Sequence, residues 1–275
     1  MKYYFKPVLQ NTIFGVVFLV SLFSPLDVSG FKADFSKQEK VIITNAVGLG
    51  VITAWGVLNW DYFKNDPHMA KEGWFERNSD HGGADKLGHF YFSYTFSHIL
   101  AAFYENSGYS TRQSARLGSL SSFAMVSWME IGDSFSSYGF SHEDFIMNLI
   151  GTATGYLFYT RPFLSEKIDF RIEYLPEFDK TDFTTDYEHQ KMIMALKFDG
   201  FDFTRDTRLK HLEIHLGYYT RGYPDKQDRE RRIYLGIGIN IPRIFNQYSM
   251  PKTSKLFSYV QMPWTYIKAD SDLNK

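Results

Sequence analysis

The chain has 275 residues, of which 44% are hydrophobic and 18% aromatic, enough for one large core or two smaller domains. Its 30 Lys and Arg residues nearly balance its 31 Asp and Glu residues. The chain therefore lacks the basic excess of nucleic-acid-binding proteins, and no nucleic-acid partner is expected. Cysteine is absent, which excludes disulfides, thiolate nucleophiles and Cys-bound zinc.

The N-terminus has the pattern of an export signal. Lys2 and Lys6 are followed by a stretch, residues 7–26, that contains no charged residue. This pattern predicts a signal peptide over residues 1–30, removed near Gly30, with an uncleaved anchor as the alternative. The missing cysteine excludes a lipid anchor of the lipoprotein type.

Residues 41–60 form a second apolar stretch with no charged residue. A helix of about 20 apolar residues is long enough to cross the hydrocarbon of a bilayer. The alternative is a buried helix in a soluble bundle. A polar loop follows at residues 61–84, marked by Pro67 and the pair Gly82-Gly83.

Three more helices are predicted, over residues 86–104, 111–131 and 141–160. Their uncharged cores are marginal in length for spanning a membrane. If all four helices crossed a bilayer from outside, the loop 131–143 would face the cytoplasm, yet it contains no Lys or Arg. A helical bundle over residues 36–162 that lies against a membrane is the alternative.

The residue pattern changes after Pro162, and the sequence of residues 163–250 predicts a small antiparallel β part. Apolar and polar residues alternate over residues 191–201, 211–223 and 232–242, as in half-buried strands. His211 and His215 are read as surface residues. A short helix and a tail are expected over residues 251–275. Because a helical part is followed by a separate antiparallel β part, the predicted fold class is α+β. Three or four strands are too few for a single-chain outer-membrane barrel.

The start of the helix at 86–104 places Asp85 and His89 four residues apart, on one helix face. A carboxylate beside an imidazole orients it and suits a general base or a metal ligand. The structural alternative is that Asp85 caps the helix and that His89 is a packing residue.

A second polar group follows along the chain. Glu130 ends one helix and Asp133 follows it, while Ser141, Asp144 and Asn148 begin the next helix. Ser141 and Asp144 have the spacing of a capping box. Short connections in an up-down bundle bring these helix ends to one side, so Asp85, His89, Glu130, Asp133 and Asp144 are expected to converge.

These residues belong to an ordered set of motifs. In chain order they are Asp85-Lys86-x-x-His89-Phe90, Glu130-x-x-Asp133-Ser134, Gly139-Phe140-Ser141-x-x-Asp144 and Asn148-x-x-Gly151-x-x-x-Gly155. Together they resemble the YfiM-like family of predicted periplasmic lipoproteins and, more faintly, VanZ-like membrane proteins. The resemblance covers about residues 80–160 and implies an envelope location. The chain departs from it by lacking the lipoprotein cysteine and by adding the β part, and the family brings no established reaction.

Three hypotheses follow. The first is a membrane-associated envelope protein with a binding or structural role, whose partner is membrane lipid or another envelope protein. The second is a hydrolase or transferase acting on lipid-linked or cell-wall material. In it His89 or Glu130 is the general base, and acids such as Asp85 orient it or hold a divalent metal. The third makes the polar set a buried hydrogen-bond network that fixes helix register, with Gly151 and Gly155 packing the helices.

Overall fold

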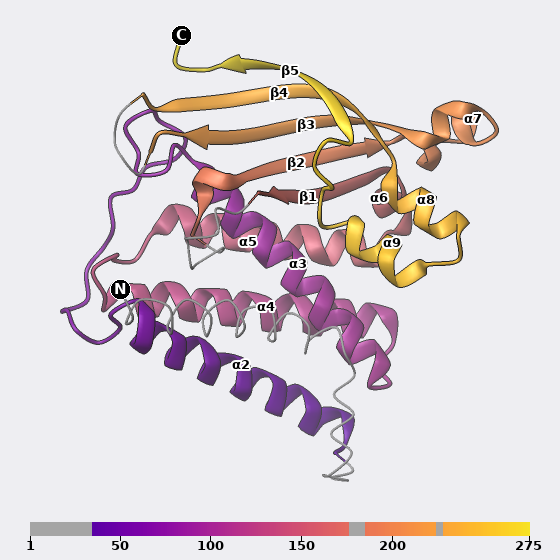
Figure 1. Cartoon of the computed structure of the whole chain (residues 1–275). Coiled ribbons are helices and arrows are strands. Elements are labelled where there is room, and N and C mark those ends of the chain that lie inside the picture. Colours follow the sequence, from indigo (N-terminus) through magenta and orange to yellow (C-terminus); the bar gives the residue numbers. More distant parts are fainter. Residues whose placement is uncertain (1–34, 176–184, 224–227) are drawn as a thin grey trace, which may run out of the picture.

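The computed structural model describes residues 35–175, 185–223 and 228–275, and it confirms the α+β class (Figure 1). Its long helices are α2 (Lys37–Asn59), α3 (Ala84–Asn106), α4 (Thr111–Ser134) and α5 (His142–Thr160). The signal peptide predicted for residues 1–30 lies outside the described residues.

Helix α2 begins with a capping box in which Ser36 and Glu39 satisfy each other's backbone amides. It packs along α4, and the amide of Asn45 donates to Ser121 Oγ of α4 at 2.9 Å and to Tyr104 Oη of α3 at 3.2 Å. Only 11% of its apolar window is buried inside the protein. The alternative of a buried helix is therefore wrong. Among the described residues, α2 is the one helix long and apolar enough to cross a membrane.

Helix α3 is the central helix, with α4, α5 and the sheet packed around it (Figure 1). Small residues on its neighbours permit the close approach. A Cβ added at Gly151 of α5 would lie 2.3 Å from the carbonyl oxygen of Phe90, and one at Gly118 of α4 would lie 2.5 Å from the backbone nitrogen of Ala101. These positions admit only glycine without a shift of the helices.

The sheet is an antiparallel meander of five strands in the order β1-β2-β3-β4-β5. The strands are β1 (Ile168–Tyr174), β2 (Gln190–Lys197), β3 (Leu212–Arg221), β4 (Glu230–Ile239) and β5 (Tyr266–Asp272). The short helix α6 (Pro162–Lys167) joins α5 to β1, and α7 (Asp202–Arg205), α8 (Ile241–Gln247) and α9 (Pro251–Phe257) lie between strands. The expected C-terminal tail thus contains a strand.

The expectation that His215 lies on the surface is wrong. His215 is fully buried on β3, and its Nε2 lies 2.7 Å from Glu213 Oε1. His211 belongs to the short helical turn before β3 and does not share its environment. The predicted alternation of apolar and polar residues along β3 is confirmed, but the polar residues, and not the apolar ones, lie on the buried face.

The loop between α2 and α3 joins the helical part to the sheet. Its backbone accepts hydrogen bonds from Tyr218 at Gly82 and from Tyr223, at 3.2 Å, at Arg77. Met69 also forms a bridge with Phe140, next to the start of α5. These contacts hold the middle of the loop, including Glu72, over the ends of the long helices.

Candidate functional site

The site lies where α3 and α5 begin and α4 ends. Gly83 takes the N-cap position of α3 with φ of 85°, a left-handed conformation that favours glycine. Asp85 is therefore not the cap of this helix, contrary to the structural alternative. It lies in the first turn, beside Lys86 and one turn before His89.

Lys86 is the centre of one half of the site. Its ammonium is fully buried and lies 2.9 Å from Asp85 Oδ2 and 2.9 Å from Asp144 Oδ1. It also pairs with Glu72 from the loop. One cation thus joins carboxylates from the loop, α3 and α5, and it offsets part of the cost of burying them.

His89 and Glu130 form the other half. Nδ1 of His89 lies 3.3 Å from Glu130 Oε1 and 3.3 Å from Asn148 Oδ1, and its Nε2 lies 3.7 Å from Asp144 Oδ2. The Asn148 amide donates to Glu130 Oε1 at 3.2 Å, and Ser93 donates to Asn148 Oδ1 at 2.8 Å. Side chains of α3, α4 and α5 therefore form one continuous polar network.

Ser141 caps α5 as expected, accepting a hydrogen bond of 3.2 Å from the Asp144 amide. The Asp144 side chain does not complete the capping box but pairs with Lys86. Asp133 lies at the rim, half buried, where its backbone oxygen accepts hydrogen bonds from the amides of Ser136 and Gly139.

The buried carboxyls of the site have shifted pKa values. Burial and the neighbouring charges of Asp144, Asp133 and Glu72 raise the pKa of Glu130 well above its usual range. Burial raises the pKa of Asp133 to about 7. Burial also raises the pKa of Asp144 to about 6, against the opposing effect of His89. Carboxyls in this range can exchange protons near neutral pH.

Glu72 and Lys86 behave as a charged pair. Burial acts to raise the pKa of Glu72, but hydrogen bonding with Asp144 and the charge of Lys86 outweigh it and hold the pKa at about 2. The surrounding carboxylates, Asp85 first, raise the pKa of Lys86 despite its burial. Lys86 is therefore expected to carry its charge at neutral pH, paired with the surrounding carboxylates.

Two overlapping groups of side chains have the spacing of metal ligands. Three donor atoms lie within 4.8 Å of one another in the group His89, Glu130 and Asp144, and likewise in the group Glu72, Asp85 and Asp144. The ammonium of Lys86 already lies among the second group. The first group combines an imidazole with two carboxylates, a donor set that suits zinc or manganese.

The structure brings together most residues singled out in the sequence. Asp85, His89, Glu130, Ser141, Asp144 and Asn148 belong to one network, and Asp133 lies at its rim. Gly151 and Gly155 lie beyond it, where α5 touches α3. Sequence reasoning missed Lys86 and Glu72. A lysine in the first turn of an acid-poor aromatic helix was the signal for Lys86, whereas Glu72 had none.

Residues 71–160 match the family model described as "Predicted periplasmic lipoprotein (DUF2279)", a range that contains the whole polar network. No curated protein and no solved structure gives a significant match to the chain. The family description agrees with the exported, cell-envelope location predicted from the sequence.

Proposed function

We propose that this protein is a membrane-associated envelope protein with a binding or structural role, and that the apolar outer surface of its helices lies against lipid. The observation that carries the proposal is the exposure of α2. Leu58 is 80% exposed and Ile42 is 67% exposed, on a helix whose residues 41–60 carry no charge. Water is an unfavourable solvent for such a surface, and acyl chains are a favourable one.

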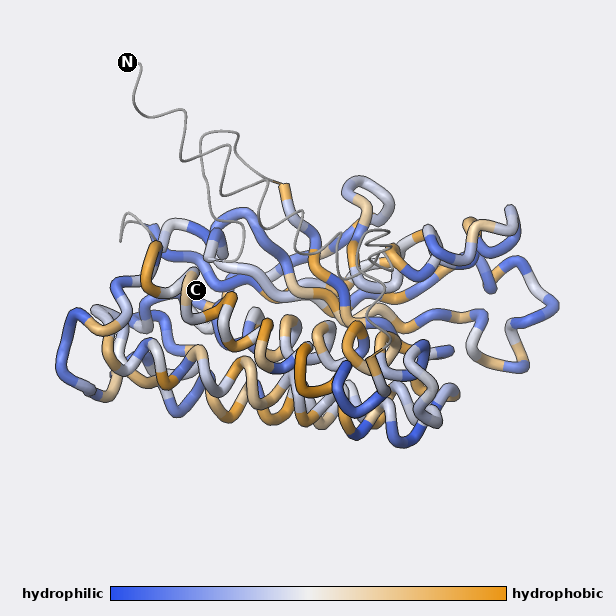
Figure 2. Tube along the Cα trace, turned by 90° about the horizontal axis from the view of Figure 1, so that it is seen from below, coloured by the Kyte–Doolittle hydropathy of each residue, from blue (hydrophilic) through white to orange (hydrophobic). Residues whose placement is uncertain are grey.

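Exposed apolar side chains also lie on α4, which packs against α2, and on α5, which packs against α4. Large apolar side chains are exposed at Leu120, Trp128 and Ile131 of α4 and at Ile146, Leu149, Ile150 and Leu157 of α5. In Figure 2, which views the molecule from the side of α2, hydrophobic segments recur along these helices. Membrane lipid is therefore the favoured partner over another envelope protein.

The polar network suits a structural role within this picture. Its side chains bond one another across three helices, and its members are largely shielded, with 16% of the His89 side chain and 22% of the Glu72 side chain exposed. A buried hydrogen-bond network can fix the register of the helices that supply it. The proposal also includes the resemblance of residues 80–160 to YfiM-like and, more faintly, VanZ-like proteins, which implies an envelope location.

The test is vesicle flotation of the purified protein with phosphatidylethanolamine–phosphatidylglycerol vesicles. The double variant Val47→Gln/Leu58→Gln should bind at least about tenfold less, since each change removes an apolar side chain that lipid would cover. Met69→Gln, which alters an exposed apolar residue in the loop, is the matched control and should bind as the wild type does. Equal flotation of the double variant and the wild type would contradict the proposal.

A second candidate is a hydrolase or transferase for lipid-linked or cell-wall material. The observation that favours it is the contact of His89 with Glu130 and Asp144, combined with the raised pKa of Glu130. His89 would act as the general base, with Glu130 and Asp144 orienting it or sharing a divalent cation. Full cellular function of both Glu130→Gln and His89→Ala would exclude this candidate.

A further inference from the structure

The sheet buries a polar face, and on β3, β4 and β5 it exposes an apolar one. The face that the protein buries carries Asp169, Arg171 and Glu173 of β1, Lys197 of β2, and Glu213 and His215 of β3. The other face is apolar. Its β1 and β2 part, with Ile172 and Met192, packs against α3, whereas its part on β3, β4 and β5 is largely exposed. This inversion is unexpected in water, where an exposed sheet face is normally the polar one.

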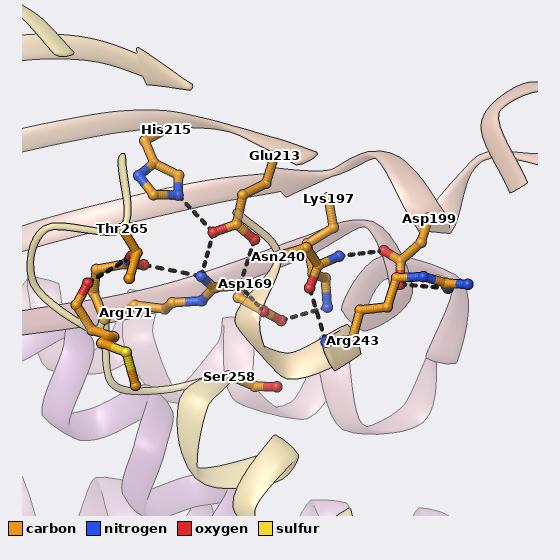
Figure 3. Close-up of polar contacts among 12 residues, drawn as sticks. Asp169, Arg171, Lys197, Asp199, Glu213, His215, Asn240, Arg243, Ser258 and Thr265 are labelled. Carbon is orange, nitrogen blue, oxygen red and sulfur yellow. Dashed lines mark hydrogen bonds and ion pairs between the residues drawn. The ribbon is translucent and has the colours of Figure 1, made fainter. Parts of the chain in front are cut away.

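The buried face is held by a network of ion pairs (Figure 3). Arg171 lies 2.6 Å from Glu213 Oε1 and 2.7 Å from Asp169 Oδ2, and it donates to Gln261 at 3.0 Å. Lys197 contacts the second oxygen of Asp169 at 2.7 Å. Since these groups are paired and almost fully buried, this face of the sheet lies inside the protein.

Glycines on the same face make room for large rings. A Cβ at Gly238 would lie 2.6 Å from the His215 ring, and one at Gly217 would lie 2.0 Å from the ring of Tyr234. The backbone next to Gln261 also pairs with Ile172 at the edge of β1. The sheet is thus closed on its polar side, whereas on its apolar side α3 covers β1 and β2 and leaves much of the rest exposed.

The apolar face runs across neighbouring strands in register. Met194 of β2, Leu216 of β3 and Leu235 of β4 are cross-strand partners, with exposures of 36%, 42% and 62%. In the next row Ile237 of β4 is 54% exposed and its partner Ile267 of β5 is 77% exposed. We call this set of five residues, with Ile233 and Ile239, the outer sheet face.

An apolar cavity of about 210 Å³ adjoins the outer sheet face. Its lining includes Leu87 and Phe90 of α3 together with Met194, Leu216 and Ile233 of the sheet. The apolar surface therefore continues from the sheet into the seam beside α3.

We propose that the outer sheet face is a lipid-binding surface that contacts acyl chains, separate from the surface of α2. Alternation of apolar outward and polar inward residues is the pattern of strands that face lipid. The outward positions of β4 from Ile233 to Ile239 carry no charge, whereas an interface between two proteins has a polar rim.

An exposed tryptophan supports lipid as the occupant. Trp264, 87% exposed, lies beside the end of β4, because the carbonyl of the next residue, Thr265, accepts a hydrogen bond from the Ile239 amide. An exposed Trp at the border of an apolar surface is typical of a membrane–water interface.

The test uses the absence of cysteine. Ile237→Cys, labelled with an environment-sensitive fluorophore, should show a blue-shifted emission with phosphatidylethanolamine–phosphatidylglycerol vesicles. Asp228→Cys, on the loop before β4, is the matched control and should show no shift. Leu235→Gln/Ile237→Gln should weaken vesicle binding about tenfold even with α2 intact.

Failure of this proposal is distinguishable from failure of the proposed function. If the protein floats through α2 while the probe at position 237 stays in water, the sheet proposal is wrong and the helical one stands. A blue shift without vesicles, with a dimeric mass in solution, would show a second copy on this face and also overturn the proposal.

Discussion

Nδ1 of His89 on α3 lies 3.3 Å from the Oε1 of Glu130 at the end of α4. This contact closes the polar network between helices, because Glu130 also accepts a hydrogen bond from Asn148 of α5. A carboxyl and an imidazole held together at 2% and 16% side-chain exposure have little competition from water. The contact therefore links α3 to α4 in a part of the protein that is largely shielded from water.

The first prediction concerns pH. The pKa of Asp133 rises from 3.8 to about 7 on folding, so the folded state holds a proton that the unfolded state has lost. Its contribution to stability is therefore greatest below about pH 4 and is lost as the pH rises through about 7. The raised pKa values of Glu130 and Asp144 also make the protein less stable as the pH rises. The lowered pKa of Glu72 has the opposite effect, because its contribution to stability is lost as the pH falls toward about 2. Asp133→Asn should flatten the decline in thermal unfolding midpoint over this window.

The control for this experiment is Asp80→Asn, since Asp80 is exposed on the loop. It should follow the wild-type pH profile. An Asp133→Asn profile as steep as that of the wild type would contradict the assignment.

The second prediction concerns Lys86. Lys86→Met removes the cation shared by Glu72, Asp85 and Asp144 and leaves these carboxylates without a partner. Breaking a buried ion pair by removing one partner costs about 3–5 kcal/mol, to be measured by urea unfolding. Lys71→Met, at an exposed loop position, should change the free energy of unfolding by less than about 0.5 kcal/mol. Equal stability of the two variants would be evidence against a network held by Lys86.

The third prediction concerns the contact of α5 with α3. Gly151→Ala places a Cβ 2.3 Å from the Phe90 carbonyl oxygen, so the helices must separate, and the expected loss is about 1–3 kcal/mol. Gly50→Ala is the matched control, because nothing lies within 4 Å of its Cβ. Alanine there should gain about 0.5–1 kcal/mol of helix stability. Thermal melts of both variants decide the point, and a neutral Gly151→Ala would refute the close approach.

The fourth prediction concerns the buried face of the sheet. Arg171→Met leaves Asp169 and Glu213 without their main cation, and it should cost about 3–5 kcal/mol in chemical unfolding. Arg208→Met, at an exposed position before β3, should be close to neutral. A stable Arg171→Met protein would show that the polar face is not a closed interior.

The polar network could be partly predicted from the sequence. Asp85, His89, Glu130 and Asp144 stand out as polar residues at the ends of apolar helices, and short connections place such ends together. Glu72 could not be predicted, because a residue in an irregular loop has no periodicity to place it. The tertiary contacts of that loop bring it to Lys86.

The sequence by itself determined the α+β class, the long helices and the alternation in the β part, because periodicity and helix-ending residues are local properties of the chain. Only the tertiary structure decided which face of each strand is buried. A period of two separates two faces without saying which one meets the protein. His215 lies on the face that is buried with the ion pairs of Arg171, whereas Ile237 lies on the opposite face and is exposed.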